Sequence, residues 1–367
     1  MIGGVDRGTT EILVRFGFEP ALFETLRNRV ATGELSSESN IVQGAIEPPR
    51  PEDLTRLPEP GDPGHDDAHS AGIEALRRGE IAQIVLAGGM ATRFGGVVKA
   101  ALPAVDGRSF LEIKLSQTRE LADHIAAEIP VALMTSFATD DVIRAHVAEH
   151  GLGDPLVFNQ FVSLRLEPNG ELFRDEAGRP SLYAPGHGDL FEALRRSGVL
   201  TALCESAVRV VTISNVDNLG ARVEPTVVGM HLLSGRPVTC EVARKEGDMG
   251  GAPVRLNGRL QLLEGPRFPK SFDQGLVPVF NTNTALLDLD ALDRDYELTW
   301  LYVRKDAGGR PAVQLERVYH EVSAFPPTTF LEVPRRGLRG RFFPIKTPDD
   351  LERAQDDLRE LLAASPI

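Results

Sequence analysis

The stretch "IVLAGGMATRFGGVVKAALP" (Ile84–Pro103) decides the fold class of this 367-residue chain. Its apolar start is typical of a strand that is buried on both faces of a parallel sheet. The strand leads into a glycine-rich turn that carries Arg93 and is followed by Lys99. Glycines let the backbone approach a ligand and present N–H groups to anionic oxygens, and the two cations add charge for a polyphosphate. The loop therefore indicates a phosphate site, with a plain glycine turn as the alternative.

The spacing of the glycines excludes the two commonest phosphate loops. Gly88 and Gly89 are adjacent and the next glycine is Gly95, which does not fit the G-x-G-x-x-G pattern of dinucleotide-binding folds. No Gly-Lys-Ser or Gly-Lys-Thr follows these glycines, so the loop is not a Walker A loop either. The loop by itself leaves the identity of its ligand open.

Strands and helices alternate after this loop. Residues 109–128 have helical periodicity and begin with a Ser-x-x-Glu capping box. Short apolar runs over 130–136 and 207–215 predict buried strands, with a helix over 139–151 between them, and Asn257-Gly258 predicts a hairpin. This order predicts an α/β fold with a mixed, mostly parallel sheet. In such sheets ligands bind beyond the carboxyl ends of the strands.

Changes in pattern divide the chain into three parts. Residues 1–75 are expected to form a helical segment and an extended linker, because prolines, glycine and acids fill 46–70 without periodicity. Residues 76–335 carry the alternating strands and helices. Residues 336–367 carry a lysine-bearing segment and a final helix that packs on the main domain, with Thr347 as its N-cap.

Composition narrows the class of protein. The chain is 42% hydrophobic and 25% charged, as in ordinary globular proteins, and no apolar run reaches the roughly 18 residues that span a bilayer. Its N-terminus lacks a signal-peptide pattern, so we expect a soluble cytoplasmic protein. The net charge of −13 argues against nucleic acid and anionic membranes as partners, and any anion must be held by a locally positive site. Cys204 and Cys240 stand in apolar contexts, which predicts two buried thiols.

Further polar residues follow other predicted elements. His187, in a glycine pocket before a helix, could donate to a phosphate or sugar oxygen or simply shape a turn. Asp217 follows a buried strand, where a carboxylate can hold Mg²⁺ against phosphates or close an Asx turn. Asn281 and Asn283 suit sugar hydroxyls, and a turn would use them equally well. Lys346 precedes the N-cap of the final helix, where an anion is favoured, although a surface lysine is the simpler interpretation.

Taken together, these segments resemble the UDP-glucose pyrophosphorylase family, also called UTP–glucose-1-phosphate uridylyltransferases. The resemblance extends from about residue 81 to the C-terminus, and the matching motifs occur in the family's order. They are "LAGGMATRFG" (86–95), "MTSFATDDV" (134–142), "FNQ" (158–160), "PGHGDLFEALRRSG" (185–198), "SNVDNLGA" (214–221), "QLLE" (261–264), "VFNTNTALLDLDAL" (279–292) and "RFFPIKTPDDL" (341–351). Such an ordered set is far more specific than one glycine loop.

The resemblance implies a Rossmann-like nucleotide-diphospho-sugar transferase fold and a Mg²⁺-dependent nucleotidyltransferase. The expected reaction joins an NTP, UTP by resemblance, to a sugar 1-phosphate such as glucose 1-phosphate and releases pyrophosphate. The nucleotide would be bound by Leu86, Ala87, Gly88, Gly89, Lys99, Gln160, Gly186 and Asp217. The sugar phosphate would be bound by His187, Asn215, Glu264, Asn281, Asn283 and Lys346. Asp217 would also hold the metal, and catalysis would depend on Arg93, Lys99 and Lys346.

The chain departs from the family pattern at several positions. The family's Gly-Pro-Lys is here Val97-Val98-Lys99, one residue shorter. Ala252 replaces a threonine and Thr284 replaces an asparagine, which indicates a less hydroxylated or differently shaped substrate. The C-terminal β-helix domain of eukaryotic members has no counterpart in the sequence, so we expect a monomer or a small homo-oligomer.

Three functions are therefore compatible with the sequence. The first is UDP-glucose synthesis. The second is a paralogue from secondary metabolism, such as antibiotic biosynthesis, that uses a cyclitol phosphate such as valienol 1-phosphate, with GTP as a candidate nucleotide. The third is an inactive sensor that binds nucleotide sugars, and the presence of Lys99, Asp217 and Lys346 argues against it.

Overall fold

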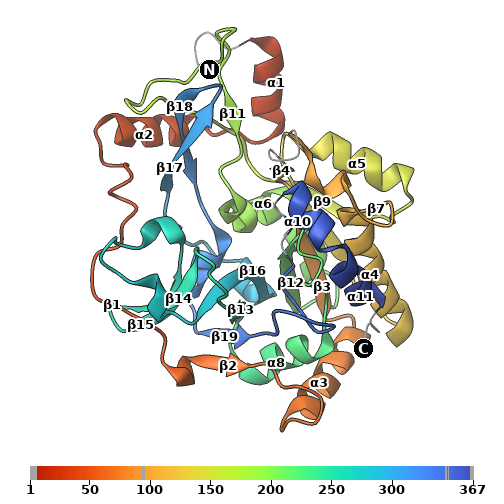
Figure 1. The fold of residues 1–367 in the computed structure, drawn as a ribbon. Helices are drawn as coiled ribbons and strands as arrows, with labels where there is room; N and C mark the ends of the chain where they lie inside the picture. Colours follow the sequence, from red (N-terminus) through yellow and green to blue (C-terminus); the bar gives the residue numbers. More distant parts are fainter. Residues whose placement is uncertain (1–5, 92–95, 344, 346, 364–367) are drawn as a thin grey trace.

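An eight-stranded sheet forms the centre of the computed structural model, which describes residues 6–91, 96–343, 345 and 347–363 (Figure 1). In spatial order its strands are β2 (Leu54–Arg56), β19 (Thr328–Glu332), β13 (Val238–Arg244), β16 (Val279–Asp288), β12 (Val210–Asn215), β3 (Ile81–Leu86), β8 (Val131–Thr135) and β9 (Leu156–Asn159). Only β16 runs antiparallel to its neighbours in this sheet. The predicted mixed, mostly parallel sheet is confirmed.

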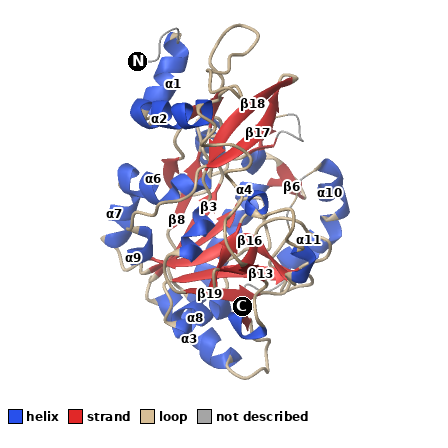
Figure 2. Cartoon of the chain, turned by 90° about the vertical axis from the view of Figure 1, so that its left-hand side faces the viewer, coloured by secondary structure: helices blue, strands red, loops and turns tan. Residues whose placement is uncertain are grey.

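Helices cover both faces of the sheet, so its central strands β3 and β12 are buried along most of their length. Ile84 and Leu86 of β3 pack in a cluster with residues of α6 (Leu190–Ser197) and α7 (Val199–Cys204). Val85, which points the other way, packs with α4 (Phe110–Ile125) and α11 (Gln355–Ala363). Figure 2 shows α6, α7 and α9 (Leu289–Leu292) on one side of the molecule and α10 (Pro348–Arg353) and α11 on the other.

The N-terminal helices pack on a hairpin away from the central sheet. The helices α1 (Arg7–Arg15) and α2 (Pro20–Ala31) confirm the predicted helical segment. Their apolar side chains share a cluster with β17 (Leu301–Ala307) and β18 (Arg310–Glu316), and Figure 1 shows this unit at the top of the molecule. A helical pair that is too small to bury its own core thus gains one from a distant hairpin.

The segment expected to be an extended linker contains regular structure. Residues 46–70 supply β1 (Ile46–Glu47), the sheet-edge strand β2 and the start of α3 (His65–Arg77). Leu54 pairs with Phe330 and Arg56 with Glu332 in parallel register. Strands this short are held by a distant partner, so local periodicity gives no sign of them. The α3 helix packs against α8 (Pro225–Ser234) below the sheet.

Most local signals in the sequence are confirmed. The hairpin of β14 (Ala252–Leu256) and β15 (Arg259–Leu263) turns at Asn257 and Gly258, both with positive φ. Capping boxes begin α4 and α10. The final helix is divided into α10 and α11, and α5 spans Asp140–Glu149.

Short two-stranded sheets complete the fold: β4 (Met90–Ala91) with β5 (Val97–Val98), β6 (Pro103–Val105) with β7 (Arg108–Ser109), and β10 (Ser163–Leu164) with β11 (Leu182–Tyr183).

One cysteine differs from its prediction. Cys240 is buried in β13, but Cys204 is exposed at the last position of α7. The apolar neighbours of Cys204 mark the buried face of its helix, and the cysteine lies on the other face. Among the described helices none is long and apolar enough to cross a membrane.

Candidate active site

A cleft of about 710 Å³ opens beyond the carboxyl ends of β3, β12 and β9. From β3 the chain continues to β8 on one side, whereas β12 lies on the other side of β3. This is a topological switch point, the place where open α/β sheets bind ligands. Its lining contains Leu86, Gly88, Gly89, Lys99, Gln160, Arg165, Ala184, Gly186, His187, Asn215, Val216, Asp217, Lys305, Asp306, Gln314 and Glu316.

The glycine loop is fixed against its neighbours at Gly88. The Gly88 carbonyl accepts a hydrogen bond from Ser136 Oγ at 2.8 Å. A Cβ atom on Gly88 would lie 2.9 Å from Nε2 of Gln160, so any residue larger than glycine would displace the side-chain amide of Gln160. Gln160 is itself buried, and its backbone N–H donates to the Thr135 carbonyl at 2.8 Å. The loop and the glutamine therefore form one surface of the cleft. Ala87, predicted to bind the nucleotide, is buried behind it.

Lys99 and Asp217 form an ion pair within the cleft lining. Lys99 begins a 3-10 helix, and Asp217 follows β12. Their side chains are 16% and 20% exposed, so the pair is largely shielded yet reachable from the cleft. Lys114 of α4 is fully buried and donates to the carbonyls of Asn218 and Ala221, just after Asp217. Burial lowers the pKa of Lys114 to about 7.

The turn at 185–188 is joined to the end of β18. Gly186 has φ of +98°, and a Cβ atom there would lie 2.5 Å from the Arg317 carbonyl oxygen. The Gly188 N–H donates to the same carbonyl at 2.9 Å. Asp189 accepts from the Arg317 guanidinium at 2.8 Å and from the Phe161 N–H at 3.1 Å. Burial raises the pKa of Asp189 to about 6, although Arg317 opposes the shift. Asp189 thereby links the turn to the backbone next to Gln160.

His187 lines the cleft as a neutral ring. The Tyr319 N–H donates to its Nδ1 at 3.1 Å, so the neutral imidazole carries its proton on Nε2. Burial lowers the pKa of His187 to about 3, and the nearby charge of His320 acts in the same direction. The histidine can therefore donate one hydrogen bond from Nε2 at neutral pH.

The predicted sugar-site residues form a hydrogen-bonded chain behind Asn215. Asn283 Nδ2 donates to Asn215 Oδ1 at 2.9 Å, and the Asn283 N–H donates to Asn281 Oδ1 at 3.0 Å. His320 contacts Asn283 Oδ1 through Nδ1 at 3.1 Å and Glu264 through Nε2. Burial alone would raise the pKa of Glu264, but the charge and hydrogen bond of His320 hold it below its usual value. Asn281, Asn283 and Glu264 do not line the cleft, and His320 was not predicted.

Two groups of residues make up most of the cleft lining. We call the residues at or after the ends of strands the strand-end wall: Leu86, Gly88, Gly89, Lys99, Gln160, Asn215 and Asp217. The residues of β17, β18 and the neighbouring Arg165 form the hairpin wall: Arg165, Lys305, Asp306, Gln314 and Glu316. The hairpin wall was not predicted. The sequence does contain a Gly308-Gly309 turn between two runs in which polar and apolar residues alternate, and this pattern predicts a hairpin. The pattern does not indicate a ligand site.

The described lining is not positively charged, contrary to the expectation of a local positive site. Its three cations, Lys99, Arg165 and Lys305, are matched by three carboxylates. Lys305 lies 3.5 Å from Glu316, and Arg165 donates to Ser181 Oγ at 2.8 Å. Arg93 and Lys346, the other predicted cations, lie outside the described residues. Anion binding by the described part must therefore draw on backbone N–H groups as well as on side chains.

The two departures that indicated an unusual sugar pocket lie away from the cleft lining. Ala252 is fully buried in an apolar cluster with Val254 and Phe268. Thr284 is buried in β16, and its Oγ1 has no hydrogen-bond partner in the described part of the chain. Neither position gives the cleft a less polar surface.

The arrangement of these elements is shared with enzymes that make nucleotide sugars. The UDP-glucose phosphorylase of Trypanosoma brucei superposes with a TM-score of 0.74 and 24% identity, over 93% of this chain and 76% of that one. A putative UDP-N-acetylglucosamine pyrophosphorylase of Entamoeba histolytica superposes with a TM-score of 0.73 and 18% identity, over 86% of each chain. The fold is thus that of the nucleotide-diphospho-sugar transferases.

Sequence comparison identifies the family within that fold. The profile of the UTP–glucose-1-phosphate uridylyltransferases matches residues 21–365. The uridylyltransferase of Musa acuminata is 31% identical over 314 residues, which cover 79% of this chain and 66% of that protein. For Hordeum vulgare the identity is 29%, over 94% of this chain and 74% of the relative. The chain belongs to the UTP–glucose-1-phosphate uridylyltransferase family. It spans slightly less than two thirds of the Musa acuminata relative and 62% of the one from Pyrus pyrifolia.

Proposed function

We propose that this chain transfers a uridylyl group from UTP to glucose 1-phosphate, with UDP-glucose and pyrophosphate as products. The observation that carries the proposal is the meeting of Gly88, Gln160, Lys99 and Asp217 in one cleft at the switch point of the sheet. Membership of the uridylyltransferase family supports UTP and glucose 1-phosphate as the substrates. Cytoplasmic location and a monomeric or small oligomeric state stay predictions.

The strand-end wall would bind the nucleotide. Its contacts would come from Leu86, Gly88, Gly89, Lys99, Gln160 and Asp217, together with Gly186 of the same cleft lining, with Ala87 supporting the loop from behind. Buried Gln160 offers both an amide donor and an acceptor, which match the edge of a uracil. The sugar phosphate would contact His187 and Asn215, held by the chain of Glu264, Asn281 and Asn283. Arg93 and Lys346 would add positive charge, as the resemblance implies.

The proposed reaction needs no general base. An oxygen of glucose 1-phosphate attacks the α-phosphorus of UTP, a new P–O bond forms, and the bond to the departing pyrophosphate breaks in line. A phosphate monoester is already an adequate nucleophile, so catalysis consists of positioning two anions and stabilising the charge that develops. Lys99 would supply that stabilisation, and His187 Nε2 would donate to a phosphate or sugar oxygen.

One protein carboxylate in the cleft fits a Mg²⁺ ion. Mg²⁺ is usually held by one or two carboxylates together with substrate phosphates. Asp217 lines the cleft beside Lys99, and no group of three metal-binding side chains occurs there among the described residues. We propose that Asp217 holds Mg²⁺, which supplies charge neutralisation on the phosphates, and that Lys99 keeps the carboxylate oriented.

Glucose 1-phosphate is a better candidate than a cyclitol phosphate. The replacements at Ala252 and Thr284, which indicated a less hydroxylated or differently shaped substrate, do not line the cleft. A sensor without activity would have no need of a shielded Lys99–Asp217 pair.

Pyrophosphate release tests the proposal directly. The full chain is incubated with UTP or GTP, and with glucose 1-phosphate or valienol 1-phosphate, in the presence of Mg²⁺. We expect rapid release only with UTP and glucose 1-phosphate. Preference for the cyclitol or for GTP would contradict the substrate assignment. Absence of release with every pair would contradict the enzymatic function.

A further inference from the structure

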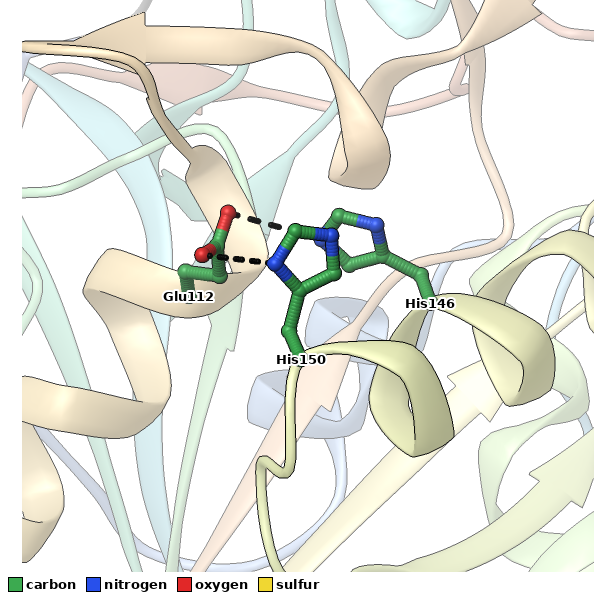
Figure 3. A group of neighbouring side chains, drawn as sticks. All are labelled: Glu112, His146 and His150. Atoms are coloured by element: carbon green, nitrogen blue, oxygen red, sulfur yellow. Dashed lines mark ion pairs between the residues drawn. The ribbon is translucent and has the colours of Figure 1, made fainter.

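A cluster of two histidines and a glutamate lies outside the cleft and takes no part in the proposed reaction. His146 lies in the last turn of α5, His150 comes four residues later, and Glu112 lies in the first turn of α4 (Figure 3). His150 directly follows the last residue of α5. One potential donor atom from each residue lies within 4.8 Å of the other two. No other such group of three occurs in the described part of the chain.

The donor spacing is close to that of a metal site. Glu112 Oε1 lies 3.1 Å from His150 Nδ1, and Glu112 Oε2 lies 3.7 Å from His146 Nε2. Zn²⁺ binds histidine nitrogen and carboxylate oxygen at roughly 2.0–2.2 Å, so neighbouring donors around one tetrahedral ion lie about 3.4 Å apart. Two histidines at positions i and i+4 of a helix face the same side and are a recurrent zinc-binding pair.

An ion-pair role explains this arrangement less well. The two imidazole rings lie only 4.2 Å apart between centroids, so two protonated rings would repel each other. Glu112 is the carboxylate that contacts both rings, and its single charge cannot offset two positive charges, while Glu149 acts on His146 at longer range. A divalent ion between two neutral rings and one carboxylate would satisfy all three groups together.

The surroundings of the cluster would support a bound ion. The Ser109 N–H donates to Glu112 Oε2 at 2.7 Å and fixes the carboxylate through the capping box. Hydrogen bonds of this kind orient metal ligands in proteins. Ser109 Oγ lies 2.8 Å from His146 Nε2, a contact that the ion would replace. The His150 side chain is 38% exposed, which leaves one side open for entry and for a water ligand.

We propose that Glu112, His146 and His150 bind one divalent transition-metal ion of the zinc type, which staples the start of α4 to the end of α5. The 3-10 helix that begins at Lys99 packs against both helices, so the ion would stiffen the frame behind the cleft. Two nitrogen donors disfavour Mg²⁺, which prefers oxygen. The site is therefore separate from the Mg²⁺ proposed at Asp217, and its test does not depend on the activity.

Zn²⁺ titration of the full chain, after treatment with a chelator, tests the site. Calorimetry should show one Zn²⁺ per chain, and the midpoint of thermal unfolding should rise with Zn²⁺ because the ion binds the folded state. Co²⁺ should give a visible absorption band of low-symmetry nitrogen and oxygen coordination. A titration in excess Mg²⁺ should give the same Zn²⁺ affinity. Absence of a stoichiometric Zn²⁺, or its displacement by Mg²⁺, would overturn the proposal.

Variants decide which residues hold the ion. His150→Ala and Glu112→Gln should each weaken Zn²⁺ binding at least tenfold, as loss of a metal-supporting group generally does. Glutamine still completes a capping box, so E112Q keeps the start of α4. His124→Ala removes an exposed histidine of α4 and should leave binding unchanged. His69→Ala tests another pair of neighbouring histidine rings, His65 and His69 of α3. A smaller loss in H150A and E112Q, or an equal loss in H124A or H69A, would overturn the assignment.

Discussion

The two walls of the cleft are built in different ways. The strand-end wall consists of side chains and backbone at the ends of strands, and Gly88, Gln160 and Asp217 are fixed by neighbours on several elements. The hairpin wall consists of long polar and charged side chains on and beside a two-stranded ribbon, such as Lys305 at 46% side-chain exposure. A rigid wall can hold the reacting atoms of the substrates in a fixed geometry. A ribbon of paired long side chains can hold the parts of the substrates that do not react. We therefore expect substitutions in the two walls to differ in kind as well as in size.

Lys99→Met should have the largest effect. The substitution removes the shielded cation that faces Asp217 and leaves the carboxylate without its partner. Loss of one preorganised charge in an active site commonly lowers turnover by roughly 100-fold or more, and we expect that loss in kcat. The measurement is steady-state pyrophosphate release. A kcat within threefold of the wild type, in a variant with unchanged thermal unfolding, would remove Lys99 from catalysis.

His187, which lines the cleft outside both walls, should make the stability of the folded chain depend on pH. Its folded pKa of about 3 lies below the usual 6.5, so the unfolded chain binds a proton that the folded chain excludes. Its contribution to stability is complete above pH 6.5 and is lost as the pH falls toward 3. Between pH 6.5 and 5 the free energy of unfolding of the wild type should fall by about 2 kcal/mol relative to that of His187→Gln.

Urea unfolding of the two proteins at several pH values measures this difference. Asp189, whose raised pKa acts in the opposite direction, is present in both proteins and cancels. Parallel stability curves for wild type and H187Q would show that the ring is not excluded from protonation.

Gly88→Ala should have a smaller effect, and the property that it changes should be the binding of the nucleotide. The added Cβ would lie 2.9 Å from the Gln160 amide, so the amide must shift. We expect KM for UTP to rise by roughly tenfold, about 1.4 kcal/mol of binding, with kcat less affected. Gly89→Ala is the matched control, because a Cβ there would meet nothing within 4 Å. Equal changes in the two variants would mean that loop flexibility matters and the contact with Gln160 does not.

Lys305→Ala should have the smallest effect. The side chain is nearly half exposed and lies 3.5 Å from Glu316, and exposed pairs contribute on the order of 0–1 kcal/mol. We expect KM for one substrate to rise by about threefold with kcat unchanged. Kinetics at varied UTP and varied glucose 1-phosphate identify that substrate. A large fall in kcat would erase the distinction between the two walls.

The two walls of the cleft also differ in how well the sequence predicts them. The ends of β3 and β12 could be located from the sequence because buried parallel strands have a clear signature, and polar residues stand at or just after these ends, as Asn215 and Asp217 do at β12. Gln160 was assigned through the family resemblance. The hairpin wall could not be located, since Lys305 and Glu316 resemble any solvated pair of residues until the fold places them in one cleft with Gln160. The buried His320 was missed for a similar reason. Its partners Asn283 and Glu264 are distant in sequence, and only the sheet brings them together.

Short edge strands escape sequence-based prediction on physical grounds too. The three residues of β2 have no periodicity of their own, and their pairing with β19 supplies the order. By contrast, the capping box of Ser109 and the Asn257-Gly258 turn depend only on neighbours in sequence, and both were predicted correctly.

The position of β2 has a consequence for the way the chain is made. Leu54 leaves the ribosome well before its partner Phe330, which is synthesised 276 residues later. At roughly 5–20 residues per second, β2 waits on the order of tens of seconds before that edge of the sheet can close. Until then the growing chain exposes an unpaired strand position and the apolar surface beneath it, which is the period of greatest risk for aggregation. A three-residue strand limits this risk, because it offers little template to another chain, and its late docking completes the sheet.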